Sequence, residues 1–241
     1  MAKINYITYN GTRSDSLGVY VSGAGSFDAA ELDLVPYEIP GKSGDLLISN
    51  NRFKNIEITY PAFVPGDFQT RVQAIRNWLR SASNYVRLRD TYDSGHFRLA
   101  VCSARQSFEP VNRNDGANFE MIFNCKPQRF ILLGGYMNVV TSGDNLQNTT
   151  ANNSFPLFEI DATNTTPTLK VVNSLGSFEL TATESLNDTF YIDCETQNIY
   201  VGATNLNSKF VGTFPIFTPG NNVITYSGCT TFYVQPNWWE L

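Results

Sequence analysis

The stretch from residue 39 to residue 60 constrains the fold of this chain most strongly. Residues 56–60 alternate strictly between apolar and polar side chains, which is the pattern of a strand with one buried face. Residues 46–48 form a continuous apolar run, and Asn50 and Asn51 separate the two runs. Because Gly, Asn and Asp favour turns, we predict two strands joined by a polar tip. Such a protrusion is either a solvated loop or an arm that lies on a neighbouring molecule.

Short β-rich runs bounded by turn residues recur along the rest of the chain. In the N-terminal half, Asn10 and Gly11 predict a tight hairpin, and residues 93–95 predict another. In the second half, Asn, Thr and Ser crowd residues 141–154, for which we predict a polar loop. The later runs have the spacing of a two-sheet sandwich, at residues 156–161, 169–172, 177–181, 190–194, 198–201, 210–217, 222–226 and 231–235.

One segment, residues 67–82, has the period of a helix. Pro65 and Gly66 end the preceding strand, and the side chain of Asp67 is predicted to cap the helix. The apolar side chains follow a helical stripe at Phe68, Val72, Ile75 and Leu79, with Trp78 on its edge. We predict that this helix covers one face of the N-terminal sheet.

Charge is distributed unevenly and suggests two domains that meet at Gly134 and Gly135. Residues 1–133 contain 15 Lys and Arg against 13 Asp and Glu, whereas residues 134–241 contain 2 against 9. The predicted fold is mainly β, with a β-sandwich or barrel-like N-terminal domain that carries the helix and a hairpin arm. A jelly-roll β-sandwich follows at residues 134–241. The scarcity of basic residues in the second half argues against tight nucleic-acid binding.

The sequence offers no recognisable catalytic or metal-binding site. Structural zinc needs closely spaced Cys and His residues, but His96 is the only histidine, and it follows a predicted turn. Gly41, Lys42 and Ser43 resemble the end of a phosphate-binding loop, yet Pro36 stands where that motif needs glycine and a β-like run follows. We therefore expect no enzyme activity, metal or cofactor. No apolar run approaches the roughly 20 residues that span a bilayer, so we expect no membrane association.

The cysteines and the C-terminal tryptophans each leave alternatives open. Cys102, Cys125, Cys194 and Cys229 are either four free thiols or one pair inside each half. Exposed indoles are unfavourable, so Trp238 and Trp239 should pack on their own domain or on another chain. A sugar-binding platform is the third alternative.

The order and spacing of several motifs resemble the distal tail protein family of long-tailed, siphovirus-type bacteriophages. The matching pieces are spread along the whole chain. They are residues 16–21, 39–41 with 44–45, 51–55, 77–79, 85–88 and 123–127 in the N-terminal half, and 153–156, 190–194, 219–222 and 236–239 in the C-terminal half.

This resemblance implies a structural hub in the virion, made in the cytoplasm of the host bacterium. The N-terminal domains of such proteins form a hexameric ring, and a galectin-like β-sandwich lies outside it. The ring joins the tail tube protein to the tail tip or baseplate proteins, and DNA passes through its lumen. Implied partners are further copies of the chain, the tail tube, a tail-associated tip protein, and receptor-binding or side baseplate proteins. The rival interpretation is a lectin-like carbohydrate-binding module for attachment to the host surface.

Two interface hypotheses follow. We expect the arm to reach the next subunit through Gly41, Lys42, Ser43, Gly44 and Asp45 at its tip, together with Asn50 and Asn51. We also expect the acidic, Asn- and Thr-rich C-terminal domain to dock other tail proteins, with Trp238 and Trp239 as candidate docking residues.

Overall fold

The computed structural model describes residues 5–23, 25, 28–111 and 115–241. The chain divides into two compact units, Met1–Arg129 together with Leu241, and Phe130–Glu240. In the described residues, no helix is long and apolar enough to cross a membrane. Whether the two halves fold as independent domains stays a prediction.

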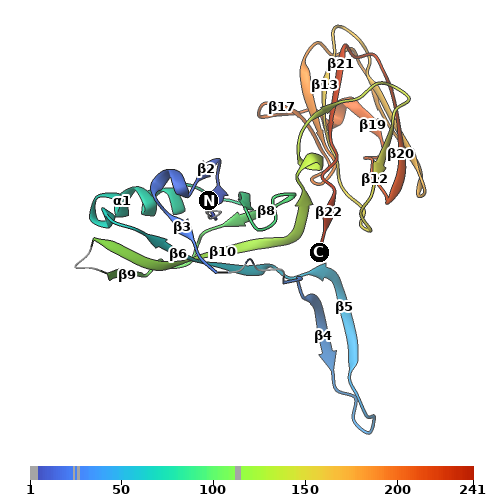
Figure 1. The fold of residues 1–241 in the computed structure, drawn as a ribbon. Helices are drawn as coiled ribbons and strands as arrows, with labels where there is room; N and C mark the ends of the chain where they lie inside the picture. The colour runs from blue at the N-terminus through green and yellow to red at the C-terminus, as the bar shows by residue number, and fades with distance from the viewer. Residues whose placement is uncertain (1–4, 24, 26–27, 112–114) are drawn as a thin grey trace. The chain divides into compact units, whose positions relative to one another are not determined.

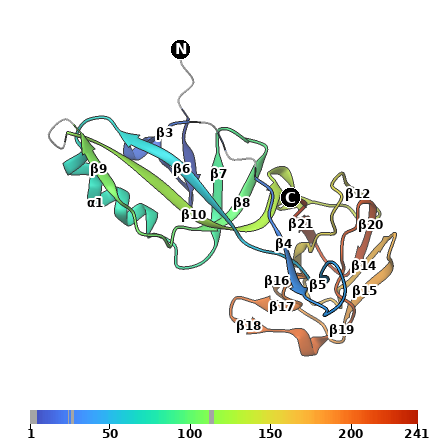
Figure 2. The same ribbon diagram turned by 90° about the horizontal axis from the view of Figure 1, so that it is seen from below.

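The first unit is built on one curled antiparallel sheet (Figures 1 and 2). Its strands follow the order β2-β1-β7-β8-β10-β6-β3, and β9 pairs with β10. Asn5, just before β1, bridges Val21 of β3, so the two ends of the sheet approach each other as in a barrel. The elements are β1 (Ile7–Tyr9), β2 (Thr12–Arg13), β3 (Tyr20–Val21), β6 (Ile56–Val64), β7 (Val86–Asp90), β8 (His96–Val101), β9 (Phe108–Val111), β10 (Gly116–Ile131) and the 3-10 turn Asp15–Leu17.

Local sequence explains several of these elements. Asn10 and Gly11 both have positive φ and close the predicted two-residue hairpin between β1 and β2. β6 buries every second residue from Ile58 to Val64, as its alternating sequence predicts. The second predicted hairpin also forms, because β7 pairs with β8.

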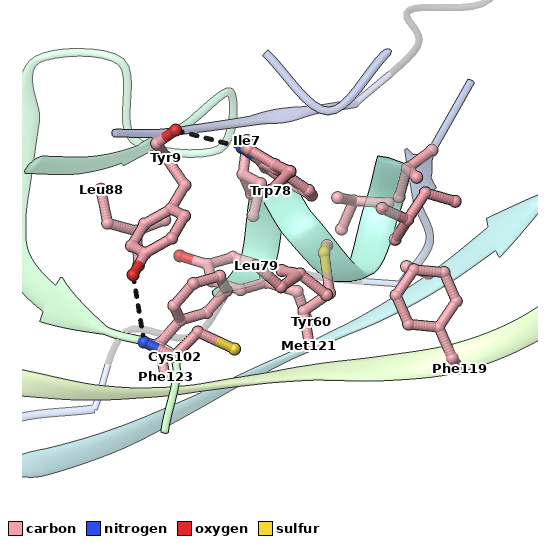
Figure 3. Packing of buried hydrophobic residues seen from close by; sticks show 14 of the residues in the cluster. Ile7, Tyr9, Tyr60, Trp78, Leu79, Leu88, Cys102, Phe119, Met121 and Phe123 are labelled. Carbon is pink, nitrogen blue, oxygen red and sulfur yellow. Dashed lines mark hydrogen bonds between the residues drawn. The ribbon is translucent and has the colours of Figure 1, made fainter. Parts of the chain in front are cut away.

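Helix α1 (Phe68–Leu79) fills the inside of the curled sheet with its apolar stripe. Ile75 and Leu79 are fully buried, and each contributes about 1.5–3 kcal/mol by leaving water. Trp78 is buried too, and its Nε1 donates to the Tyr9 carbonyl at 3.1 Å (Figure 3). The hydroxyl of Tyr9 accepts from the amide of Cys102, the residue after β8, at 3.2 Å. Tyr9 of β1 thus connects the helix to the end of β8.

The predicted side-chain cap of this helix is wrong. Asp67 makes no side-chain capping bond, because its backbone is left-handed with φ 50°. Asp115 holds the helix start instead: its carboxylate accepts from the Asp67 amide at 3.1 Å and its carbonyl from the Phe68 amide at 2.8 Å. The helix also ends at Leu79 rather than at residue 82.

The second unit is a sandwich of two antiparallel sheets, with the strand orders β11-β21-β13-β16-β17-β18 and β12-β20-β14-β15-β19. Its core is a cluster of apolar side chains that includes Phe158, Phe190, Phe217 and Phe232. The strands of the two sheets are β11 (Asn138–Val139), β12 (Asn145–Asn148), β13 (Leu157–Asp161), β14 (Thr168–Asn173), β15 (Gly176–Ala182), β16 (Thr189–Asp193), β17 (Asn198–Val201), β18 (Thr204–Asn205), β19 (Phe210–Gly212), β20 (Gly220–Ser227) and β21 (Thr231–Gln235). The short strand β22 (Trp239–Glu240) belongs to neither sheet and pairs with β10. Two 3-10 turns, Leu133–Gly135 and Asn207–Lys209, complete the second unit.

Two predictions for the second unit need correction. The polar segment 141–154 is not simply a loop, because it contains β12, which pairs with β20 through Asn148 and Leu146. The run 210–217 is a strand only as far as Gly212. At β12 the pairing partner overrides the local composition, whereas β19 ends at Gly212, whose φ is 126°.

The second unit also buries a polar network that the sequence does not reveal. Asn222 is fully buried on β20. Its amide nitrogen donates to the carbonyls of Thr218 at 2.9 Å and Gly220 at 3.1 Å, and its amide oxygen accepts from the Thr218 amide at 2.9 Å. These bonds satisfy groups that would be costly to bury unpaired.

Candidate functional site: the β4–β5 arm

The arm consists of β4 (Leu32–Tyr37), β5 (Leu46–Phe53) and the turn of residues 38–45 between them. Among the described residues, these two strands pair only with each other, as a separate two-stranded sheet. Figure 1 shows them side by side as a long hairpin that extends away from the curled sheet of the first unit. An isolated two-stranded hairpin is marginally stable in water. Contacts beyond the β4–β5 pair would therefore stabilise this arm.

The predicted hairpin exists, but it is assembled differently from the prediction. The second strand of the hairpin is β5 and the first is β4, whereas β6 belongs to the curled sheet, where it pairs with β3 and β10. Asn50 and Asn51 do not form the tip, because they lie inside β5. The register shifts here, so that residues 50–52 of β5 oppose Asp33 alone, and Asn51 has a φ of 53°. The break expected at these asparagines is therefore a bulge within a strand.

The predicted tip residues Gly41, Lys42, Ser43, Gly44 and Asp45 do lie together in the exposed turn 38–45. Gly41 and Gly44 have φ values of 81° and 85°, which only glycine adopts without strain. The turn leads into β5 rather than into a helix, so it lacks the geometry of a phosphate-binding loop. The role of these residues in a subunit interface stays a prediction, as does that of Asn50 and Asn51.

An ion pair fixes the bulge at the base of the arm. Arg52 Nε donates to Asp33 Oδ2 at 2.7 Å, and the carboxylate is largely buried. Hydrogen bonds from Arg52 and then from Asn50 hold the pKa of the Asp33 carboxyl below its usual range. Next to this pair, the Lys54 amide donates to the Glu31 carbonyl at 2.8 Å. The arm thus has a defined base and an exposed outer part.

The arm exposes many large apolar side chains, which the sequence prediction missed. Seven large apolar side chains are between 37% and 59% exposed: Leu32, Leu34, Tyr37, Ile39, Leu46, Leu47 and Ile48. Large apolar side chains exposed together on so short a segment are typical of an interaction site. The signal in the sequence was the run at residues 46–48, which does not alternate as a strand with one wet face would.

Both faces of the arm carry these side chains. Directly opposite residues of an antiparallel pair point to the same face, and successive residues to opposite faces. The pairs Val35–Ile48 and Tyr37–Leu46 therefore share one face, while the pair Pro36–Leu47 lies on the other. The arm has no polar face over this stretch, which is not the pattern of a hairpin that lies on its own domain.

The candidate docking residues Trp238 and Trp239 pack within the second unit. The Trp239 indole donates to the Asn153 carbonyl at 2.9 Å, and the Asn152 side chain donates to the Trp239 carbonyl at 3.2 Å. Trp238 lies against Gly134, with its carbonyl accepting from the Ile131 amide at 2.8 Å. Of the predicted alternatives, the structure shows packing on their own unit, and a docking role stays a prediction.

The surroundings of the cysteines and of His96 do not resemble a reactive site. All four cysteines are free, and Cys102, Cys125 and Cys194 are buried. Burial raises the pKa of the Cys102 thiol to about 11 and that of Cys125 to about 12, so neither is a ready nucleophile. His96 Nδ1 lies 2.7 Å from Asp93 Oδ1. Within the described residues, no group of three or more His, Cys, Asp or Glu side chains is arranged to hold a metal ion.

Comparison with known proteins finds the same fold in a phage hub protein and a phage baseplate. No protein-family model matches the chain. No curated protein matches its sequence. Among solved structures, it is similar to the Dit protein (gp 19.1) of phage SPP1, described as a paradigm of the hub adsorption apparatus in phages that infect Gram-positive bacteria. That match has a TM-score of 0.68 and 10% identity, and it covers 96% of this chain and 98% of the other.

A second similar structure is a chain of the phage p2 baseplate in its activated conformation. The TM-score is 0.58 at 10% identity, with coverage of 96% of this chain and 97% of the other. Over nearly its whole length, the chain therefore has the fold of these phage hub and baseplate proteins. The likeness in fold that the sequence resemblance predicted is confirmed, and so is the mainly β class.

Proposed function

We propose that this chain is a structural hub of a phage tail tip, where six copies form a ring. The ring joins the tail tube to the tip or baseplate proteins, and DNA passes through its lumen. The fold shared with a phage hub protein and a baseplate protein supports this role. The proposal is a non-enzymatic one, in which shape and repeated contacts carry the function.

The observation that carries the proposal is the exposed apolar arm. A closed ring of identical subunits needs a head-to-tail contact that every copy offers and every copy accepts. Each copy has one arm, whose seven exposed apolar side chains need one binding surface per chain. A second copy supplies that surface at the required ratio, and closure of the ring leaves no arm uncovered.

The electrostatics are compatible with a ring around DNA. The first half of the chain carries nearly balanced charge, 15 basic against 13 acidic residues, so it offers little excess attraction for phosphates. The second half is acidic, with 9 acidic residues against 2 basic ones. We assign to it the docking of other tail proteins, because such a surface suits protein partners better than anionic ones.

The experiment is a mass measurement by light scattering after size exclusion, over a wide range of concentrations. We expect the mass of six 26.9 kDa chains. A triple variant, Leu46→Ser, Leu47→Ser and Ile48→Ser, should be folded but monomeric, because these side chains are exposed in the single chain. The control, Val172→Ser with Leu175→Ser, removes exposed apolar groups from the second unit and should leave the ring intact.

Two results would contradict the proposal. A wild-type chain that is monomeric at every concentration does not build a ring. A triple variant with the wild-type mass would show that the arm is not the subunit contact. Strong binding of a monomer to a glycan array would favour the lectin-like alternative instead.

A further inference from the structure

We propose that a cavity in the first unit binds one small monovalent anion such as chloride. Three arginines from neighbouring strands line this cavity: Arg89 of β7, Arg98 of β8 and Arg129 of β10 (Figure 2). We call it the three-arginine cavity. Its carboxylates are those of Asp90, at the end of β7, and Asp93, in the connection to β8. The site is separate from the arm and does not depend on the proposed ring.

The carboxylate of Asp90 is occupied by neutral donors. Its Oδ1 accepts from the backbone amides of Tyr92 at 2.9 Å and Asp93 at 2.8 Å. Its Oδ2 accepts from the Tyr60 hydroxyl at 2.6 Å. These bonds use most of the acceptor capacity of a carboxylate. Asp90 therefore holds a turn and a buried tyrosine, and none of these bonds comes from an arginine.

The carboxylate of Asp93 is shared between two other side chains. Its Oδ1 lies 2.7 Å from His96 Nδ1, and its Oδ2 lies 3.4 Å from Arg129 Nη1. With His96 neutral, the three arginines and the two carboxylates that line the cavity leave one positive charge in excess. One monovalent anion would balance that charge.

Arg98 is a buried cation that forms no ion pair with the described residues. It is 9% exposed, and its guanidinium donates to the backbone carbonyls of Pro127 at 3.2 Å and Asp28 at 3.5 Å. Burial lowers the pKa of this guanidinium, because it removes the water that would solvate the charge. A buried charge is costly unless an opposite charge accompanies it. An anion in the cavity would supply that opposite charge.

Arg89 brings further donors to the same cavity. Its Nε is buried and has no hydrogen-bond partner in the described part of the chain, and its Nη2 donates to the Ser94 carbonyl at a long 3.4 Å. Buried N–H groups normally have an acceptor, and a charged donor binds a charged acceptor more strongly than a neutral one. One anion would therefore accept from Arg89 and offset the charge of Arg98.

The size of the cavity limits the anion that it can take. Its volume is about 20 Å³, which is enough for about one water-sized group. A monatomic anion is of this order of size, whereas a phosphate group with its shell of oxygens exceeds it. The cavity therefore suits chloride better than phosphate, and a free ion better than a nucleic-acid backbone.

The linewidth of the chloride NMR signal measures this binding directly in a solution of the full chain. A chloride ion that exchanges between water and a protein site broadens the signal. We expect excess broadening with wild-type protein that saturates as the chloride concentration rises. Gluconate keeps the ionic strength constant, because it is too large to enter the cavity.

Arg98→Met and Arg87→Met form a matched pair of variants. Each removes one positive charge and keeps a long side chain, but Arg87 lies over the Phe97 ring at 4.6 Å and does not line the cavity. We expect Arg98→Met to reduce the excess broadening at least about tenfold, because it removes a charged donor, and Arg87→Met to leave it unchanged. An apolar residue in place of a buried charge is often tolerated. If Arg98→Met does not fold, Arg89→Met tests the same cavity at a less buried position.

Thermal unfolding at constant ionic strength gives an independent readout. An anion that binds only the folded chain stabilises it in proportion to its occupancy. Replacing about 300 mM gluconate by chloride should therefore raise the Tm of the first unit by at least about 3 °C more in the wild type than in Arg98→Met. Equal broadening in Arg98→Met and Arg87→Met, or an equal change of Tm in Arg98→Met and the wild type, would overturn the proposal. Either result leaves the proposed ring untouched.

Discussion

Replacement of Asn222 by alanine should destabilise the second unit by about 3 kcal/mol, although the substitution removes only a small polar side chain. Asn222 is fully buried, and its side chain takes part in five hydrogen bonds. Its oxygen accepts from the Thr218 amide at 2.9 Å and from the Asn173 side chain at 3.0 Å. Its nitrogen donates to the carbonyls of Leu146, Thr218 and Gly220, at 3.3, 2.9 and 3.1 Å.

The magnitude follows from what the truncation leaves behind. Thr218 is 2% exposed, so its amide would lose its acceptor where water does not reach it easily. An unpaired buried donor costs about 1–3 kcal/mol, and the lost bonds to the carbonyls add about 1 kcal/mol net. The Asn173 side chain keeps its bond to the Ile216 carbonyl at 2.7 Å and adds little. For a unit of this size, about 3 kcal/mol corresponds to a fall in Tm of about 10–20 °C.

The assay is differential scanning calorimetry of the full chain, with the transition of the second unit assigned by hydrogen exchange. Gln147→Ala is the matched control: Gln147 is exposed on the neighbouring strand β12 and should change stability by less than about 0.5 kcal/mol. Asn222→Asp keeps the shape but turns a carboxylate toward three carbonyls, so it should be at least as destabilising as alanine. A loss below about 1 kcal/mol for Asn222→Ala, or a neutral Asn222→Asp, would refute the reasoning.

Three further predictions concern the first unit and the thiols. Ile75→Ala should lower the free energy of unfolding by about 2–5 kcal/mol in urea titrations, because Ile75 is fully buried on the apolar stripe of α1, whereas the exposed Gln73→Ala should stay within about 0.5 kcal/mol. In native protein, Cys229 should react with a thiol reagent before the other three cysteines, since it alone is only half-buried. Mass spectrometry of the labelled peptides gives the order of reaction, and a buried thiol that reacted first would contradict the prediction. The lowered pKa of Asp33 means that its pair with Arg52 contributes fully above the ordinary carboxyl pKa and is lost as pH falls through the lowered value. Carboxyl NMR should show this titration, with Arg52→Gln moving the Asp33 pKa upward. An unchanged pKa would show that Arg52 does not stabilise the Asp33 carboxylate.

Local pattern predicted those elements whose cause is local. The alternation of β6, the apolar stripe of α1 and the turn at Asn10 and Gly11 each reflect side chains a few residues apart, and each appears in the structure. The predicted cap of α1 was wrong because Asp115, remote in sequence, occupies the place that a capping side chain would take. The prediction of a polar loop around β12 was wrong for a similar reason, because β12 pairs with β20, a strand far along the chain.

The sequence by itself determined that this chain is mainly β, with one helix and a protruding hairpin near residue 46, because propensity and period act between neighbours. Only the tertiary structure decided that β5 pairs with β4 while β6 joins the curled sheet. Strand pairing is a choice among distant partners, and one stretch of sequence fits several of them equally well. That choice leaves the apolar side chains of residues 46–48 exposed on both faces of an arm, which turns an ordinary β-rich run into the candidate functional surface.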